Sequence, residues 1–151
     1  MVDQREHITS FTSLGRSGLQ VPRLGVGAMT WGEATGLARW TPAQLAYGGA
    51  HGREEEQRAL EASLAAGVTL FDTAAMYSNG ASERRVGELA LGKDIVIATK
   101  FPPSLLSRTE DLSRALDASL ARLGRQSVDL YQHHFPTSRV SIPDLMERIA
   151  D

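Results

Sequence analysis

An acidic and a phenolic side chain stand close together in the segment LFDTAAMYSNGASE, residues 70–83. Asp72 ends a short apolar run, and Tyr77 follows five residues later, where we expect a loop. A carboxylate at the end of a buried strand needs a partner, because removing its charge from water costs several kcal/mol. The segment therefore predicts that a cation lies beside Asp72.

Two later segments offer further polar groups at the ends of apolar runs. VIATKF (96–101) carries Lys100, and VDLYQHHF (128–135) carries His134. Alternate residues of a strand share a face, so Lys100 shares its face with Ala98, and His134 shares its face with Gln132. His133 falls on the opposite face, and we expect it to be structural.

A carboxylate, a phenol, an ammonium and an imidazole can together donate a proton to a carbonyl group. The reference pKa of tyrosine is near 10, and a neighbouring ammonium favours the tyrosinate, while a carboxylate keeps that ammonium charged. An imidazole can hydrogen-bond the substrate oxygen and orient it. The set contains no strong nucleophile and suits no familiar metal site. Such a proton donor needs a separate hydride source, which implies a nicotinamide cofactor.

Strands and helices alternate along the chain in a way that would bring these groups together. We expect a hairpin over 11–24 and strands at 24–29, 68–74, 94–101 and 127–135. We expect helices at 53–67, 82–92 and 107–124, and the start of another at 142–151. This order predicts a parallel sheet with helices outside. The C-terminal ends of the strands in such a barrel-like sheet form one rim, where active sites lie.

Composition limits the class of protein. The 151 residues are enough for one domain with a core, and the net charge of −2 gives no basic field for nucleic acid. The chain has no cysteine, which excludes disulfides and zinc–thiolate sites and fits a reducing cytosol. The polar N-terminus and the lack of a long apolar run argue against a secretory signal and a membrane span. We therefore expect a cytoplasmic protein that binds neither nucleic acid nor membranes.

Four segments together resemble the aldo-keto reductases, which are NADPH-dependent enzymes built on a (β/α)8 barrel. They are LGVGAMTWG (24–32), FDTAAMYSNGASERRVGELA (71–90), VIATKF (96–101) and VDLYQHHFP (128–136). The resemblance implies a cofactor, NADPH or NADP, and a small carbonyl substrate. It also implies catalytic roles for Asp72, Tyr77, Lys100 and His134, contacts to the cofactor from Ala28, Met29 and Asp72, and a substrate-pocket position for Trp31.

The resemblance covers residues 11–136, which correspond to the hairpin and the first four β/α units. We therefore expect residues 1–151 to form a single domain equivalent to half of the barrel, whereas a complete barrel runs to roughly twice this length. The family's main cofactor clamp lies on strands five to eight. Two functions remain open: an aldehyde or ketone reductase with Tyr77 as proton donor, and a catalytically silent half-barrel that acts as an assembly or cofactor-sensing module.

Four parallel strands do not close a barrel, because an interior filled with side chains needs about eight. The sheet would leave an apolar trough and two open edges, which are sites for pairing with another chain. We expect the trough to be buried in a homodimer or against a complementary half-barrel chain. The residues expected to line it are Val26, Leu70, Val96, Ala98 and Leu130.

Overall fold

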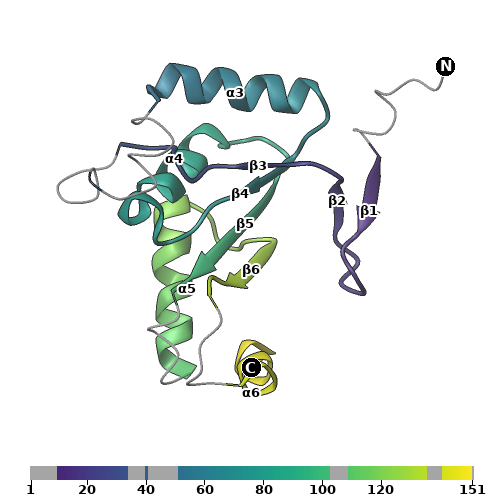
Figure 1. The fold of residues 1–151 in the computed structure, drawn as a ribbon, viewed down its shortest axis with the longest axis vertical. Coiled ribbons are helices and arrows are strands. Elements are labelled where there is room, and N and C mark those ends of the chain that lie inside the picture. The colour runs from purple at the N-terminus through teal and green to yellow at the C-terminus, as the bar shows by residue number, and fades with distance from the viewer. Residues whose placement is uncertain (1–9, 34–39, 41–50, 103–108, 136–140, 151) are drawn as a thin grey trace.

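The computed structural model describes residues 10–33, 40, 51–102, 109–135 and 141–150. Its first element is a hairpin, in which β1 (Phe11–Ser13) pairs antiparallel with β2 (Gln20–Pro22). The Leu14 N–H donates to the Leu19 carbonyl at 2.8 Å and closes the turn. The hairpin stands apart from the main sheet, beyond its N-terminal end (Figure 1).

A four-stranded parallel sheet forms the centre of the molecule. Its strands are β3 (Gly25–Gly27), β4 (Leu70–Asp72), β5 (Val96–Phe101) and β6 (Leu130–His133). They pair in chain order, β3-β4-β5-β6, and each neighbouring pair is parallel. The parallel sheet that the alternation of elements predicted is confirmed, although the strands are shorter than expected.

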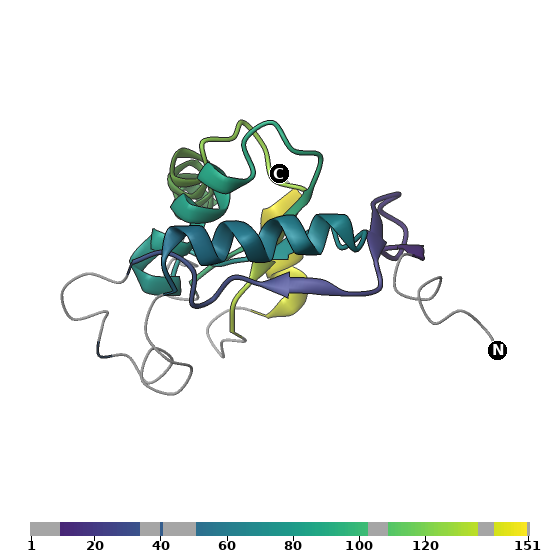
Figure 2. The ribbon, with the colours of Figure 1, turned by 90° about the horizontal axis from the view of Figure 1, so that it is seen from above.

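A helix follows each of these four strands. They are α3 (Arg53–Ala65), α4 (Ala81–Leu89), α5 (Thr109–Leu123) and α6 (Ile142–Ala150). A short 3-10 turn, η2 (Tyr77–Gly80), leads directly into α4. Seen from above, α5 lies to one side of the sheet (Figure 2). No helix in the described part of the chain is both long and apolar enough to cross a bilayer.

The core lies between the sheet and these helices. Register aligns Val26 with Phe71, and Phe71 with Ile97, so these three side chains share the face that packs on Leu60 of α3 and Val86 of α4. A second cluster joins Phe101 of β5 to residues of α5 and α6, namely Leu112, Ala115 and Leu145. The helices therefore cover one face of the sheet.

Val26 does not line the opposite face, and that part of the predicted trough is wrong. Gly25 and Gly27 take the positions next to Leu70 and Asp72, so β3 contributes no side chain beyond the α-carbon there. The space above Gly25 is taken by Leu70, whose Cδ2 would lie 3.1 Å from an added Cβ.

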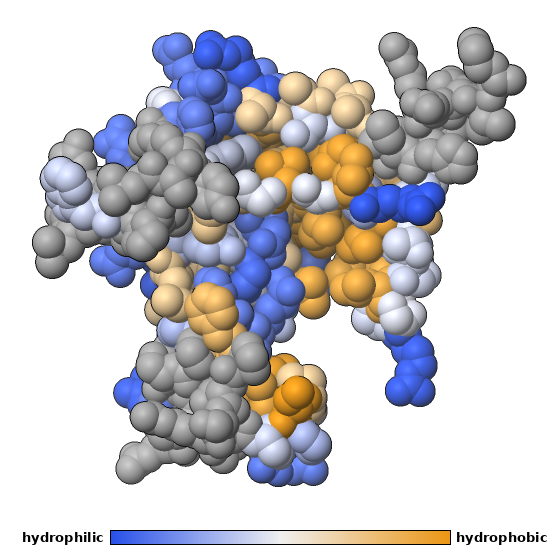
Figure 3. All heavy atoms as spheres, in the orientation of Figure 1, coloured by the Kyte–Doolittle hydropathy of each residue, from blue (hydrophilic) through white to orange (hydrophobic). Residues whose placement is uncertain are grey.

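The face of the sheet away from the helices carries the remaining predicted residues. Leu70, Val96 and Leu130 are half-buried, and the short Ala98 side chain between them is buried. Apolar side chains gather over this part of the sheet and beside the hairpin (Figure 3). Exposed Leu24 adds to the apolar surface where the hairpin joins β3.

Helices α4 and α5 approach each other closely because α4 has a glycine at the contact. A Cβ on Gly87 would overlap the carbonyl of Leu123. Packing at this distance places the first turn of α4 beside the last turn of α5, where Glu83 and Arg122 form an ion pair. That pair lies beneath the rim at which β4 and β5 end.

Candidate active site

Asp72 and Lys100 form an ion pair at the C-terminal ends of neighbouring strands. The Lys100 Nζ donates to Asp72 Oδ2 at 2.6 Å and to the Thr73 carbonyl at 2.9 Å. The Lys100 side chain is 14% exposed and the Asp72 side chain 36%. The predicted pairing of Asp72 with a cation is confirmed. Because the ammonium is held by both a carboxylate and a carbonyl, its position is fixed while its third proton remains available.

Tyr77 lies on the turn after β4 and contacts the same ammonium. The Lys100 Nζ reaches the Tyr77 Oη at 3.4 Å, which is longer than a usual N–H···O hydrogen bond, and lies 4.9 Å from the centre of the tyrosine ring. The phenol is therefore beside the positive charge without a tight bond to it. A small change in either side chain would make or break this contact.

Three successive residues with left-handed backbone follow Tyr77. Ser78, Asn79 and Gly80 have φ of 49°, 54° and 79°. A left-handed conformation costs a non-glycine residue about 1–2 kcal/mol, although asparagine tolerates it better than most. Strain of this kind persists where surrounding contacts hold the backbone, and it is common at functional sites. The turn directs the chain from the rim down into α4.

His134 completes the group on the same side of the sheet. Its ring meets the Tyr77 ring edge-on at 5.4 Å and stacks on Phe135 at 4.4 Å. Burial lowers the pKa of His134, and the charge on Lys100 lowers it further, with Asp72 acting in the opposite direction. The imidazole is therefore neutral at pH 7. Its Nδ1 is buried and has no hydrogen-bond partner among the described residues.

His133 lies on the opposite face, as alternation predicts. Register pairs it with Phe101, and the two rings stack at 5.2 Å. Burial lowers its pKa too. The structure thus separates two adjacent histidines into one at the rim and one within the aromatic packing under α5 and α6.

Gln132 is a site residue that we did not predict from the sequence. Its Nε2 donates to Asp72 Oδ1 at 3.2 Å, so both oxygens of Asp72 have a partner. The sequence did contain a signal for this role, because Gln132 shares its strand face with His134.

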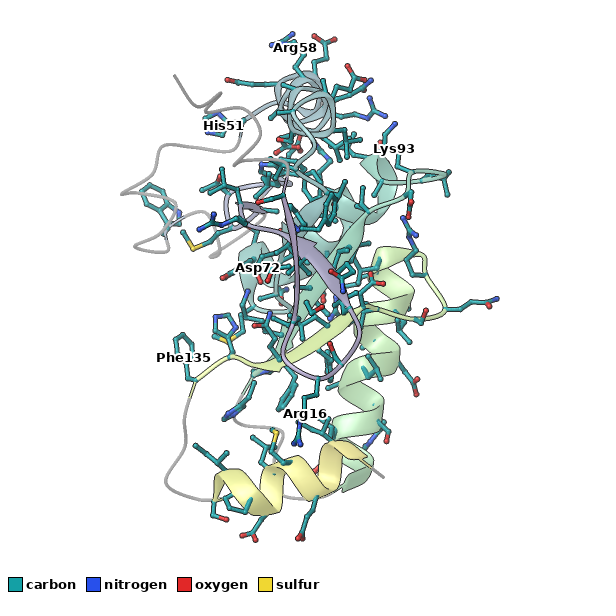
Figure 4. All side chains as sticks on the ribbon, turned by 90° about the vertical axis from the view of Figure 1, so that its right-hand side faces the viewer. Arg16, His51, Arg58, Asp72, Lys93 and Phe135 are labelled. Carbon is teal, nitrogen blue, oxygen red and sulfur yellow. The ribbon has the colours of Figure 1, made fainter. Side chains whose placement is uncertain are left out.

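Asp72 lies near the middle of the molecule and Phe135 projects from the end of β6 toward the same side (Figure 4).

Two of the residues expected at the cofactor and the substrate have buried side chains. Ala28 is fully buried and Trp31 is 6% exposed, with its ring 6.0 Å from that of Phe71. The structure therefore brings Asp72, Tyr77, Lys100 and His134 together, while the side chains of Ala28 and Trp31 belong to the core beneath them. Met29 is half-buried.

The first turn of α4 ties the strand ends to one another. Ser82 Oγ donates to the Ala28 carbonyl at 2.5 Å and lies 2.7 Å from Thr73 Oγ1. Since a serine hydroxyl has a single proton, Thr73 is the donor to Ser82. The next residue, Glu83, is fully buried and accepts a hydrogen bond from Thr99 Oγ1 at 2.6 Å. The ends of β3, β4 and β5 are thus all bound to this helix.

A second buried acid fixes the segment that follows Trp31. Glu56 of α3 is 1% exposed, accepts a hydrogen bond from the Gly32 N–H at 2.8 Å and pairs with Arg85 of α4. Glu56 and Glu83 each lie in the first turn of a helix, where sequence alone favours a solvated charge. Within the described residues, no group of three acidic or histidine side chains is placed to hold a metal ion.

Comparison with known proteins gives a consistent result. The profile of the aldo/keto reductase family matches residues 23–151. Aldo-keto reductase YhdN of Bacillus subtilis (strain 168) is 32% identical over 151 residues, which covers 91% of this chain and 41% of that protein. The chain thus spans less than half the length of this relative.

Two solved structures are also similar. An aldo-keto reductase from Klebsiella pneumoniae in complex with NADPH has a TM-score of 0.66 and 28% identity, covering 88% of this chain and 42% of that chain. The holo form of aldo-keto reductase AKR11C1 from Bacillus halodurans has a TM-score of 0.71 and 26% identity, covering 94% and 45%. The hairpin and the parallel sheet of this chain correspond to part of the (β/α)8 barrel found in these structures, as predicted.

Proposed function

The chain belongs to the aldo/keto reductase family, and on that premise we propose that it carries the proton-donating site of an NADPH-dependent reductase of aldehydes or ketones. The observation that supports this most strongly is the set of contacts made by Lys100. Its ammonium lies between the Asp72 carboxylate and the Tyr77 hydroxyl at the C-terminal rim of a parallel sheet. Active sites of barrels built from such sheets lie at this rim.

Tyr77 acts as the general acid in this proposal. Its hydroxyl gives a proton to the carbonyl oxygen of the substrate as that oxygen becomes an alkoxide. The Lys100 ammonium stabilises the negative charge left on the phenolic oxygen, because it is already placed beside it. Asp72 holds the Lys100 ammonium in position. The neutral His134 imidazole donates to the same substrate oxygen and orients it.

The residues present fit a nicotinamide cofactor. The site offers a proton donor and no strong nucleophile, so reduction of a carbonyl needs a hydride, which NADPH supplies when bound. Asp72 and Met29 are the half-buried groups at the ends of β4 and β3, and we propose that they contact the nicotinamide end. Ala28 would contribute to cofactor binding from the core, by fixing the position of Met29. Trp31 would support the wall of the substrate pocket from beneath.

We also propose that the open face of the sheet is buried against further polypeptide, either in a homodimer or against a complementary half-barrel chain. Leu70, Val96 and Leu130 leave an apolar surface there, and β3 and β6 are edge strands of the described sheet. Single-domain organisation and a cytoplasmic location belong to the same proposal. The lack of cysteine in the sequence supports that location.

The test is NADPH consumption, followed by absorbance, with a reactive small aldehyde. We expect turnover by the chain, no turnover by Tyr77→Phe, and full turnover by Tyr131→Phe. The last variant makes the same chemical change at a hydroxyl on the helix-covered face of β6. Equal rates in the wild type and in Tyr77→Phe would remove Tyr77 from the mechanism. Binding of NADPH without turnover would instead support a cofactor-sensing module.

A further inference from the structure

We propose that Glu83 is a positioning residue that holds the Lys100 strand and the Tyr77 turn in a fixed relation to each other. This inference rests on the reductase site proposed above. Among the described residues, the Glu83 carboxylate binds Thr99 and Arg122, and it is fully buried between β5, α4 and α5. Its two oxygens bind two different elements, and each of these elements carries or supports one member of the site.

One oxygen fixes the strand that carries Lys100. Thr99, which is also fully buried, donates from Oγ1 to Glu83 Oε1 at 2.6 Å. Thr99 immediately precedes Lys100 and points to the opposite face of β5. A hydrogen bond to a charged acceptor is about twice as strong as one between neutral groups, so this contact resists sliding or twisting of β5 at the residue next to Lys100.

The other oxygen fixes the turn that carries Tyr77. Arg122 of α5 donates from Nε to Glu83 Oε2 at 2.5 Å and from Nη2 to Ser119 Oγ at 3.1 Å. The aliphatic part of Arg122 lies directly against Gly80, where an added Cβ would be 2.5 Å from Arg122 Cδ. Glu83 therefore holds Arg122 in place beneath the last residue of the left-handed turn.

Small movements matter here because the contact between the two catalytic groups is long. The Lys100 Nζ and the Tyr77 Oη are 3.4 Å apart, near the outer limit for a hydrogen bond. A misplacement of about 1 Å at a reacting group can lower the rate about a hundredfold. Relaxation of either the Thr99 or the Arg122 contact would displace one group relative to the other.

A purely structural role for Glu83 makes a different prediction. Breaking a buried ion pair destabilises a protein wherever it lies, so lower stability alone does not identify a positioning residue. A positioning residue must also change the local arrangement of the site. The contact between the Tyr77 and His134 rings reports on that arrangement, because one ring lies on the turn and the other follows β6.

The experiment compares Glu83→Gln and Thr99→Val with two matched controls. Glu88→Gln makes the same change on the same helix at a half-exposed ion pair with Arg53. Thr99→Ser retains the hydroxyl that Glu83 binds. Thermal unfolding, the nuclear Overhauser effect between the Tyr77 and His134 rings, and the His134 ring-proton shifts are measured for each protein. The constants kcat and KM are measured alongside them.

We expect both test variants to weaken the Tyr77–His134 Overhauser effect and to shift the His134 ring protons, while both controls match the wild type. Where turnover is present, kcat should fall about tenfold to a hundredfold, with little change in KM. Unchanged ring signals in a destabilised Glu83→Gln protein would overturn the proposal. Loss of the folded state in both test variants would overturn it too, since Glu83 would then serve folding. The ring signals decide the matter even if the wild type shows no turnover.

Discussion

Replacement of Lys100 by methionine tests the centre of the proposed site. The substitution keeps an unbranched, apolar side chain of similar length, so it removes the ammonium with little loss of packing. The ammonium makes contacts of 2.6 Å to Asp72 Oδ2, 2.9 Å to the Thr73 carbonyl and 3.4 Å to the Tyr77 Oη. Without it, Asp72 keeps its hydrogen bond from Gln132 alone.

The expected loss of stability follows from the exposure of the pair. Hydrogen bonds to charged groups contribute about 1.5–3 kcal/mol when buried, whereas exposed ion pairs contribute about 0–1 kcal/mol. The Lys100 side chain is 14% exposed and that of Asp72 36%, so water replaces part of the lost interaction. We expect unfolding free energy to fall by about 1–2 kcal/mol, which for a chain of this size lowers the melting temperature by about 2–8 °C.

Circular dichroism during thermal and urea unfolding measures this change. Arg53→Met is the matched control, because it removes a cation from an ion pair with Glu88 in which both side chains are about half exposed. That control should lose less than about 0.5 kcal/mol. A cycle with Asp72→Asn should show coupling between the two positions. Equal melting temperatures for Lys100→Met and the wild type, or additive effects in the cycle, would refute the reasoning.

Four further outcomes are expected. Tyr77→Phe should abolish reductase activity and leave the melting temperature within a few degrees, because it removes one hydroxyl at the rim. Proton NMR should give His134 a pKa below its ordinary 6.5, raised again in Lys100→Met. At pH values between this lowered pKa and about 6.5, His134 binds more protons in the unfolded chain than in the folded chain. The free energy of unfolding should therefore rise with pH across this interval. Calorimetry should show that NADPH binds with a dissociation constant weaker than micromolar. The phosphate clamp that the family resemblance implies lies on strands beyond the four described, and each lost charged hydrogen bond costs about 1.5–3 kcal/mol. A tighter dissociation constant would contradict this expectation. Sedimentation should show a dimer, and a stable monomer at micromolar concentration would argue against burial of the open face.

The alternation of side chains along the strands predicted the site well in β5 and β6, where polar and apolar residues are easily distinguished. It placed Lys100 and His134 on one face of the sheet and His133 on the other, and register confirms the separation of Lys100 from Phe101 and His133. Period two in a parallel sheet is enforced by backbone geometry, so few local effects can override it. Those positions could be predicted from the sequence alone.

The same reasoning failed for β3, where the pattern carries little information. Val26 stands between Gly25 and Gly27, which have no side chains to indicate either face. The decision is made by distant residues, because Phe71 and Ile97 place Val26 against the helices. Trp31 is a similar case, because its buried ring packs beside that of Phe71, which is distant in the sequence. Nothing local in the sequence indicates contacts of this kind.

The hydrogen bond between Glu56 and the Gly32 N–H has a consequence for how proteins of this architecture can vary. Glu56 is itself held by Arg85, so the backbone at Gly32 is anchored to two helices. Substitution of Glu56 or Arg85 would therefore act on the backbone at Gly32 and leave the contact between Asp72 and Lys100 in place.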